Sequence, residues 1–154
     1  EFYNRNFSIT EIEYAVSKIK VHSAPGPDGI LPILISKAGK NKNKVLKKLY
    51  NKCWNNGTFP KRWKLENKIY VPKQGKSDYT NSKSYRRISL TNVFGKIYER
   101  LADFRLRHFI DKMGLLDTYQ FAYQQDKSIE QALLYFTLNI IKARNDKEKL
   151  SPVT

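Results

Sequence analysis

The stretch Ser-Tyr-Arg-Arg-Ile-Ser-Leu-Thr-Asn, residues 84–92, decides the fold of this chain. Residues 67–72 form an apolar, β-prone segment that predicts one strand, and residues 85–90 predict a second. The polar residues between the two segments predict a loop, so the strands should pair antiparallel. Asn92 is a suitable N-cap for a helix that runs to about Met113 and stops at Gly114. The expected fold class is α+β, mainly helical with a small antiparallel β unit.

Further helices are expected on both sides of this unit. Ser8 with Glu11, and Ser128 with Gln131, have the spacing of capping boxes, in which each side chain satisfies a backbone amide of the other. The second of these helices should end at about Asn145. Both boxes therefore mark the start of an amphipathic helix.

Residues 24–30, Ala-Pro-Gly-Pro-Asp-Gly-Ile, predict a rigid turn, because two prolines remove amide donors and the two glycines can adopt positive φ. A short helix should follow at 31–38, and the basic stretch 40–48 should run into another that stops at Gly57. The last predicted helix has heptad-like apolar spacing, which we interpret as core packing rather than a coiled coil. The apolar stripes expected in the core are Ile12, Ala15, Val16 and Ile19; Val45, Leu46, Leu49, Tyr50, Cys53 and Trp54; Val93, Ile97, Leu101 and Phe104; and Ile129, Leu133, Phe136, Ile140 and Ala143.

The composition points to a folded, strongly basic chain. The length of 154 residues suits one domain or part of one, and 40% hydrophobic residues argue against disorder. A net charge of +15 favours polyanionic partners, although a merely soluble, lysine-rich protein is the alternative. The single Cys53 excludes an intramolecular disulfide and suggests a reducing, intracellular compartment. No signal peptide, membrane segment or zinc site is expected, and no membrane partner.

Two cations are candidates for binding phosphate. Lys73 follows the first predicted strand and Arg86 lies in the second, so a hairpin would direct both toward one place. A lysine offers a compact charge and an arginine can engage two oxygens, which together suit a triphosphate. The alternative is two solvated cations in a chain that has many.

A second basic group lies on the helix after Asn92, where Lys96, Arg100 and Arg107 share one face with Asp103. A salt-bridged solvent face is the favoured interpretation, and contact with a nucleic-acid backbone is the alternative. Asp28 is expected to fix its turn rather than to act in catalysis. Because no carboxylate pair suitable for two metal ions is visible, we assign no catalytic or metal-binding residue.

Taken together, six ordered motifs resemble reverse transcriptases of non-LTR retrotransposons. The family shows a Pro-Gly-Pro-Asp-Gly-Ile turn, a Phe-Pro…Trp approach to a strand ending Pro-Lys-x-Gly, a Tyr-Arg-Pro-Ile-Ser-Leu segment, a Lys-Ile/Leu-x-Glu-Arg helix and a Gln-Phe-Gly-Phe-Arg turn. The corresponding segments here are residues 23–30, 59–63, 71–75, 85–90, 96–100 and 120–124.

The resemblance implies a right-hand polymerase, with residues 1–154 forming the fingers and the start of the palm and ending before the catalytic aspartates. The parent would be an RNA-directed DNA polymerase that uses deoxynucleotides and Mg²⁺ on an RNA template and DNA primer, together with its palm and thumb. By resemblance, Lys73 and Arg86 bind the nucleotide's phosphates or nearby template, and Gln120 and Phe121 help to shape the nucleotide pocket. The fragment alone should be inactive, and the parent should occur in nucleus and cytoplasm.

Three departures distinguish this chain from the family pattern. Arg87 replaces the family's proline, and Gln124 replaces its arginine. Ala122 replaces a glycine, which matters if that position needs positive φ. These changes suit a divergent or decayed element. A non-catalytic basic module that binds RNA or DNA, and a non-functional relic, are therefore the competing hypotheses.

Overall fold

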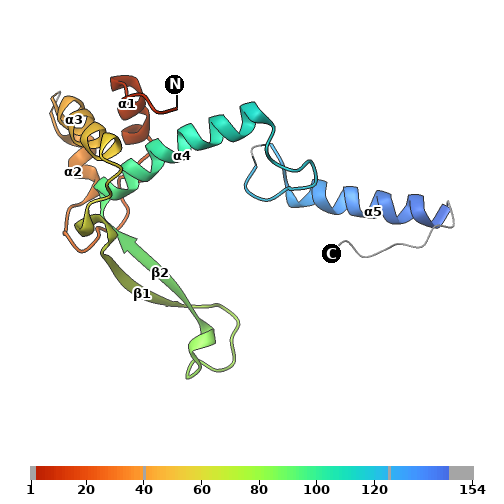
Figure 1. Cartoon of the computed structure of the whole chain (residues 1–154). Helices are drawn as coiled ribbons and strands as arrows, with labels where there is room; N and C mark the ends of the chain where they lie inside the picture. Colours follow the sequence, from red (N-terminus) through yellow and green to blue (C-terminus); the bar gives the residue numbers. More distant parts are fainter. Residues whose placement is uncertain (1–2, 40, 125, 146–154) are drawn as a thin grey trace. The chain divides into compact units, whose positions relative to one another are not determined.

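The computed structural model describes residues 3–39, 41–124 and 126–145, and the chain divides into two compact units, Glu1–Phe109 and Ile110–Thr154. Figure 1 shows the helices and the single hairpin of the described chain. The predicted α+β class is confirmed. The elements are α1 (Ile9–Ser17), α2 (Pro32–Lys37), α3 (Lys42–Asn55), the 3₁₀ turn η1 (Lys61–Lys64), β1 (Glu66–Pro72), the 3₁₀ turn η2 (Ser82–Ser84), β2 (Tyr85–Thr91), α4 (Val93–Met113) and α5 (Ile129–Asn145).

The core of the first unit forms where α1, α3 and α4 bring their apolar faces together. Tyr50 of α3 and Tyr98 of α4 stack with ring centroids 5.6 Å apart, and the Tyr50 hydroxyl donates a hydrogen bond to the Phe94 carbonyl at 3.1 Å. Burial raises the pKa of the Tyr50 phenol, so it stays protonated as that donor. The buried members of the core are Phe7, Ile12, Ala15, Val16, Leu46, Tyr50, Cys53, Val93, Ile97, Tyr98 and Leu101.

The prediction of which apolar residues lie in the core is wrong for some positions. Val45 and Leu49 of α3 and Phe104 of α4 are exposed, although the apolar spacing predicted them in the core. Each lies at the margin of its helix's apolar face, where spacing alone cannot show how far the neighbouring helix reaches. Phe104 still contacts the first helix through Tyr14, with ring centroids 5.4 Å apart.

Arg105, which the sequence did not single out, ties the N-terminal segment to α4. Its side chain is 2% exposed and donates to both carboxylate oxygens of Glu11, at 2.9 and 3.2 Å. It also donates to the backbone carbonyls of Tyr3, Arg5 and Asn6. Burial opposes ionisation of Glu11, but the hydrogen bonds from Arg105 and Ser8 outweigh it and lower the pKa of Glu11.

Local signals placed most helix ends correctly. Ser8 and Glu11 form the predicted capping box, and Ser128 and Gln131 form the second one. Gly57 adopts φ +59° after α3 and closes a Schellman motif, since its amide and that of the next residue donate back to the last turn.

The two strands pair as predicted, in an antiparallel hairpin whose register sets Val71 opposite Arg86 and Tyr70 opposite Arg87. Neither strand contains a buried residue. At the tip, the hydroxyls of Tyr79 and Tyr85 donate to backbone carbonyls of the loop at 3.0 and 3.1 Å. The predicted connection between the strands is therefore an ordered set of hydrogen-bonded turns.

The Pro-Gly-Pro-Asp-Gly turn packs against the base of this hairpin. Asp28 accepts a hydrogen bond from the Ile30 amide at 3.1 Å, as expected of a turn-forming carboxylate. Of the two glycines only Gly29 has positive φ, at +68°. Gly26 is required for space, because a Cβ there would lie 2.5 Å from the Asn92 amide nitrogen.

The second unit contains the end of α4, a turn region and α5. Ala143 of α5 is buried, but the other members of the predicted stripe are not core residues. Ile129, Leu133, Phe136 and Ile140 are exposed, so the prediction of core packing is wrong for them. Apolar residues at helical spacing show that one face of a helix can be buried, but they do not show which surface covers that face.

Candidate nucleotide and nucleic-acid interface

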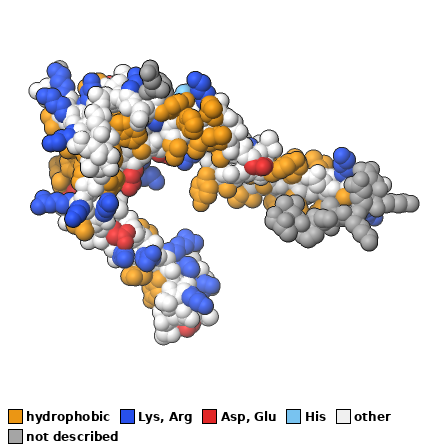
Figure 2. All heavy atoms as spheres, viewed as in Figure 1, with side chains coloured by type: hydrophobic (Ala, Val, Ile, Leu, Met, Phe, Trp, Pro, Cys, Tyr) orange, Lys and Arg blue, Asp and Glu red, His pale blue; other side chains and the backbone are white. Residues whose placement is uncertain are grey.

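Lys73 and Arg86 lie close to each other along the hairpin. Arg86 of β2 pairs with Val71, and Lys73 directly follows Pro72, the last residue of β1. The Lys73 amide donates to the Ser84 carbonyl, just before β2. Strand alternation, continued one residue past β1, would set Lys73 and Arg86 as diagonal neighbours roughly 7–8 Å apart. Figure 2 shows Lys and Arg side chains gathered along the hairpin and around its tip.

The tip of the hairpin holds Lys73 in place. Its backbone amide donates to the Ser84 carbonyl at 2.7 Å, and its ammonium donates to the Lys83 carbonyl at 2.8 Å. A lysine ammonium has three donors, which leaves two for a ligand. Arg86 is exposed, so its guanidinium can turn toward an anion that Lys73 contacts.

The base of the hairpin is fixed by Asn92. Its side-chain oxygen accepts from the Gly95 amide at 2.8 Å, which caps α4, and its side-chain nitrogen donates to the Arg62 carbonyl at 3.2 Å. The residue is 3% exposed. One side chain therefore joins β2, α4 and the 3₁₀ turn η1, and couples the hairpin to the helical core.

Gln120 and Phe121 lie in the turn region of the second unit. The backbone carbonyl of Gln120 accepts from the Lys127 ammonium at 3.0 Å, and the same ammonium lies 5.3 Å from the centre of the Phe121 ring. Positive φ occurs at Tyr123 and Asp126, whereas Ala122, the position of the family's glycine, is not among the residues with positive φ. The concern that Ala122 would be strained is therefore removed.

The basic face of α4 has mixed character. Arg107 forms a bidentate pair with Asp103, both distances being 3.0 Å, so the favoured salt-bridge interpretation is confirmed for that residue. Arg100 and Lys96 are half-buried and lie about two and three turns closer to the hairpin than Arg107. Neither forms an ion pair with the residues that the structure describes.

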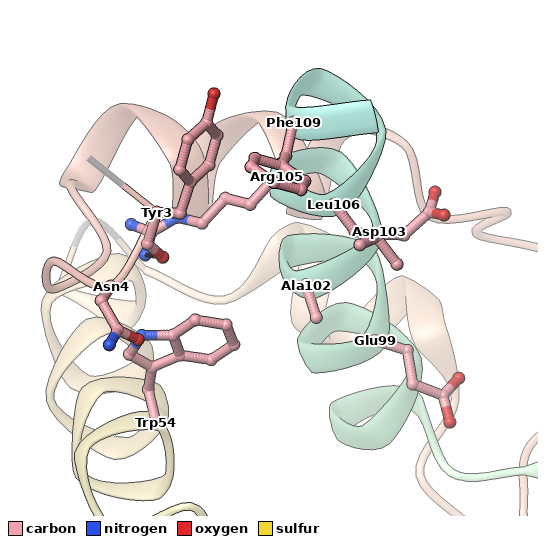
Figure 3. A pocket seen from close by; sticks show the side chains of 9 residues that line it. All are labelled: Tyr3, Asn4, Trp54, Glu99, Ala102, Asp103, Arg105, Leu106 and Phe109. Atoms are coloured by element: carbon pink, nitrogen blue, oxygen red, sulfur yellow. Dashed lines mark hydrogen bonds between the residues drawn. The ribbon is translucent and has the colours of Figure 1, made fainter. Parts of the chain in front are cut away.

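An apolar groove of about 650 Å³ lies between the N-terminal segment, α3 and α4. Figure 3 shows Trp54 facing the groove, whereas the carboxylates of Glu99 and Asp103 point away from Trp54. Arg105 also lines the groove, but its donors are occupied by Glu11 and backbone carbonyls. The charged residues that line the groove are therefore either directed away from Trp54 or already hydrogen-bonded. Within the described ranges, no cluster of three His, Cys, Asp or Glu residues could hold a metal ion.

The hairpin, its anchored base and the ordered motifs can now be compared with those of known proteins. Comparison with known proteins identifies the relatives: the chain is similar to RNA-directed DNA polymerases of non-LTR retrotransposons, which confirms the resemblance. It is 28% identical over 145 residues to a probable RNA-directed DNA polymerase from transposon BS of Drosophila melanogaster, across 94% of this chain. It is also 28% identical over 141 residues, 92% of this chain, to the RNA-directed DNA polymerase from mobile element jockey of the same fly.

A third relative is a retrovirus-related Pol polyprotein from type-1 retrotransposable element R1 of Bradysia coprophila, 28% identical over 127 residues and 82% of this chain. The chain spans only 16%, 15% and 12% of the lengths of these three curated relatives. No protein-family model matches the chain. In the part of the chain that the structure describes, no helix is both long and apolar enough to cross a membrane.

Proposed function

We propose that residues 1–154 form the fingers and the start of the palm of a right-hand, RNA-directed DNA polymerase. In this proposal Lys73 and Arg86 contact the triphosphate of the incoming deoxynucleotide or the template beside it. Gln120 and Phe121 help to shape the nucleotide pocket, and Lys96 and Arg100, with Arg107, lie along the nucleic-acid backbone. The relatives, which are themselves polymerases of mobile elements, support the class of activity.

One observation carries the assignment of the nucleotide contacts. Arg86 lies in β2 and Lys73 directly follows β1, on a hairpin whose tip and base are both held by hydrogen bonds, which supports a common ligand for the two cations. Fixed cations neutralise the phosphate oxygens without reorganising at the moment of reaction, which is how phosphoryl transfer is chiefly catalysed. An arginine can engage two oxygens while the lysine engages a third.

The remaining partners follow from the class. We propose an RNA template, a DNA primer and the palm and thumb of the same polymerase as partners, with deoxynucleotides and Mg²⁺ in the complete enzyme. Among the described residues, no cluster of three His, Cys, Asp or Glu side chains could hold Mg²⁺. Residues 1–154 alone should not extend a primer, and the parent would act in nucleus and cytoplasm.

The test uses the complete parent chain in a primer-extension assay. Changing Lys73→Ala or Arg86→Ala should raise the KM for deoxynucleotide about 10- to 100-fold, the effect of losing one hydrogen bond to a charged group. Template affinity, measured separately, should change much less. Lys48→Ala, an exposed cation of α3, is the matched control. Equal losses of nucleotide and template affinity would show that the assigned roles are wrong.

A basic module that binds RNA or DNA without polymerisation is the second candidate. The net charge of +15 and the exposed cations of the hairpin favour it. It predicts strong salt-dependent binding by residues 1–154 and no defect specific to nucleotide in the parent enzyme. Comparing the change in KM for deoxynucleotide with the change in template affinity therefore distinguishes the two candidate functions.

A further inference from the structure

The other face of the hairpin carries a separate set of side chains. Alternation from the observed register puts Lys68, Tyr70, Tyr85, Arg87 and Ser89 on this face, opposite the one that holds Lys73 and Arg86. Tyr70 is 61% exposed, and Arg87, directly across from it, is also exposed. We call Tyr70, Tyr85 and Arg87 the tyrosine face.

The tyrosines of this face are held at a defined spacing. Tyr85 pairs with Pro72, two residues from Tyr70, so the two tyrosines are diagonal neighbours roughly 7–8 Å apart. The Tyr85 ring packs edge-on against Tyr79 with centroids 6.2 Å apart, and its hydroxyl donates to the Tyr79 carbonyl at 3.1 Å. The face therefore presents aromatic surface whose position the hairpin fixes in advance.

Charge is concentrated beside Tyr70. At the base of the face, the Lys68 ammonium pairs with Glu66 at 3.3 Å, and hydrogen bonds from Ser89 and Lys68 lower the pKa of Glu66. Arg87 forms no ion pair or side-chain hydrogen bond with the described residues. Arg87 interacts with Glu66 only through charge, as a further cause of the lowered pKa of Glu66. A guanidinium whose donors are not bonded to described residues, next to an exposed aromatic ring, matches a ligand that has both phosphates and flat bases.

We propose that the tyrosine face binds single-stranded RNA, with bases stacked on Tyr70 and Tyr85 and a phosphate held by Arg87. Aromatic platforms combined with cations are how proteins hold single strands, whereas paired bases in a duplex do not offer their faces for stacking. The choice of RNA rests on the proposed function, which requires an RNA template. The hairpin would then separate two tasks, with triphosphate on the Lys73 face and template on the tyrosine face.

The experiment measures the affinity of residues 1–154 for a fluorescein-labelled single-stranded RNA by anisotropy, over a series of salt concentrations. Tyr70→Thr, which keeps a strand-forming residue, should weaken binding about 5- to 100-fold with little change in salt dependence. Tyr70→Phe keeps the ring and should bind within about 2-fold of wild type, since ring stacking dominates. Arg87→Ala should reduce the slope of log affinity against log salt by about 0.7, the value for one phosphate contact on a single strand.

Matched controls lie on the same hairpin and on α3. Ile69→Thr makes the corresponding change on the Lys73 face, and Lys48→Ala removes an exposed charge elsewhere. Circular dichroism confirms that each variant is folded. If Tyr70→Thr and Ile69→Thr bind alike, or if the wild-type chain binds no RNA, the tyrosine face is not an RNA site. Tighter binding of single-stranded DNA or duplex than of single-stranded RNA would overturn the choice of ligand.

The RNA-binding experiment and the primer-extension experiment can fail independently of each other. Failure of Tyr70→Thr to weaken RNA binding leaves the nucleotide roles of Lys73 and Arg86 intact. Failure of the kinetic test on Lys73 and Arg86, with RNA binding still dependent on Tyr70, removes the nucleotide assignment and keeps the RNA face.

Discussion

Changing Gly26→Ala tests the packing of the Pro-Gly-Pro-Asp-Gly turn against the hairpin base. A Cβ at this position would lie 2.5 Å from the Asn92 amide nitrogen, 2.6 Å from the Thr91 carbonyl carbon and 2.7 Å from the Asn92 Cα. All three are backbone atoms, so no side chain can rotate away. Restoring an ordinary contact of 3.4 Å from 2.5 Å requires a movement of about 0.9 Å.

The cost follows from what that movement disturbs. Overpacking a closed site costs about 1–3 kcal/mol. Moving Asn92 also weakens its cap on the Gly95 amide, and loss of such a cap costs about 1 kcal/mol. We expect the free energy of unfolding to fall by about 2–4 kcal/mol, and the melting temperature by about 4–16 °C for a chain of this length.

Urea unfolding followed by tryptophan fluorescence measures this loss. The two tryptophans, Trp54 and Trp63, both lie in the first unit, so their emission reports on the part of the molecule that contains the turn. Gly39→Ala is the control, because a Cβ there would meet no atom within 4 Å. An unfolding midpoint for Gly26→Ala equal to that of Gly39→Ala would refute the reasoning. A cooperative transition in the wild-type chain would also count against an unfolded relic.

Three further outcomes are expected in the same unfolding assay. Arg105→Ala should lower the free energy of unfolding by about 3–5 kcal/mol, because it removes both guanidinium donors from the Glu11 carboxylate, whose side chain is only 10% exposed. Arg107→Ala, two residues along the same helix, should cost at most about 0.5 kcal/mol, because its pair with Asp103 is exposed; similar losses for the two variants would contradict the assigned burial. The stability that ionised Glu11 contributes should be complete above about pH 4.5 and should be lost as the pH falls through the lowered pKa of Glu11. Wild type should therefore lose stability in acid, and Glu11→Gln should lose less. Equal loss of unfolding free energy in acid for the two proteins would refute this.

The predicted features that the structure confirms are mostly local. The capping boxes, the glycine stop after α3 and the turn at Asp28 depend on residues within four positions of each other, so the sequence contains all the partners. The pairing of the two strands could also be predicted, because each strand is short and a polar loop connects the two. From this pairing, the sequence predicted that the hairpin would direct Lys73 and Arg86 toward one place.

The remaining features depend on partners far apart in the chain. The sequence did not single out Arg105, because its partner Glu11 lies 94 residues away and the pair forms only when both side chains are packed away from solvent. The exposure of Phe104 and of the α5 stripe likewise depends on which surfaces pack on those helices, which apolar spacing does not encode.

By itself, the sequence determined the fold class, the relatives and the pair of cations on the hairpin, because each rests on local spacing or on ordered motifs. Only the tertiary structure decided that Gly26 is needed for space and that Tyr70 and Arg87 stand opposite each other. It also decided that one buried arginine holds the N-terminal segment to α4. These features arise from close approach and from strand register, which exist only after distant parts of the chain have packed together.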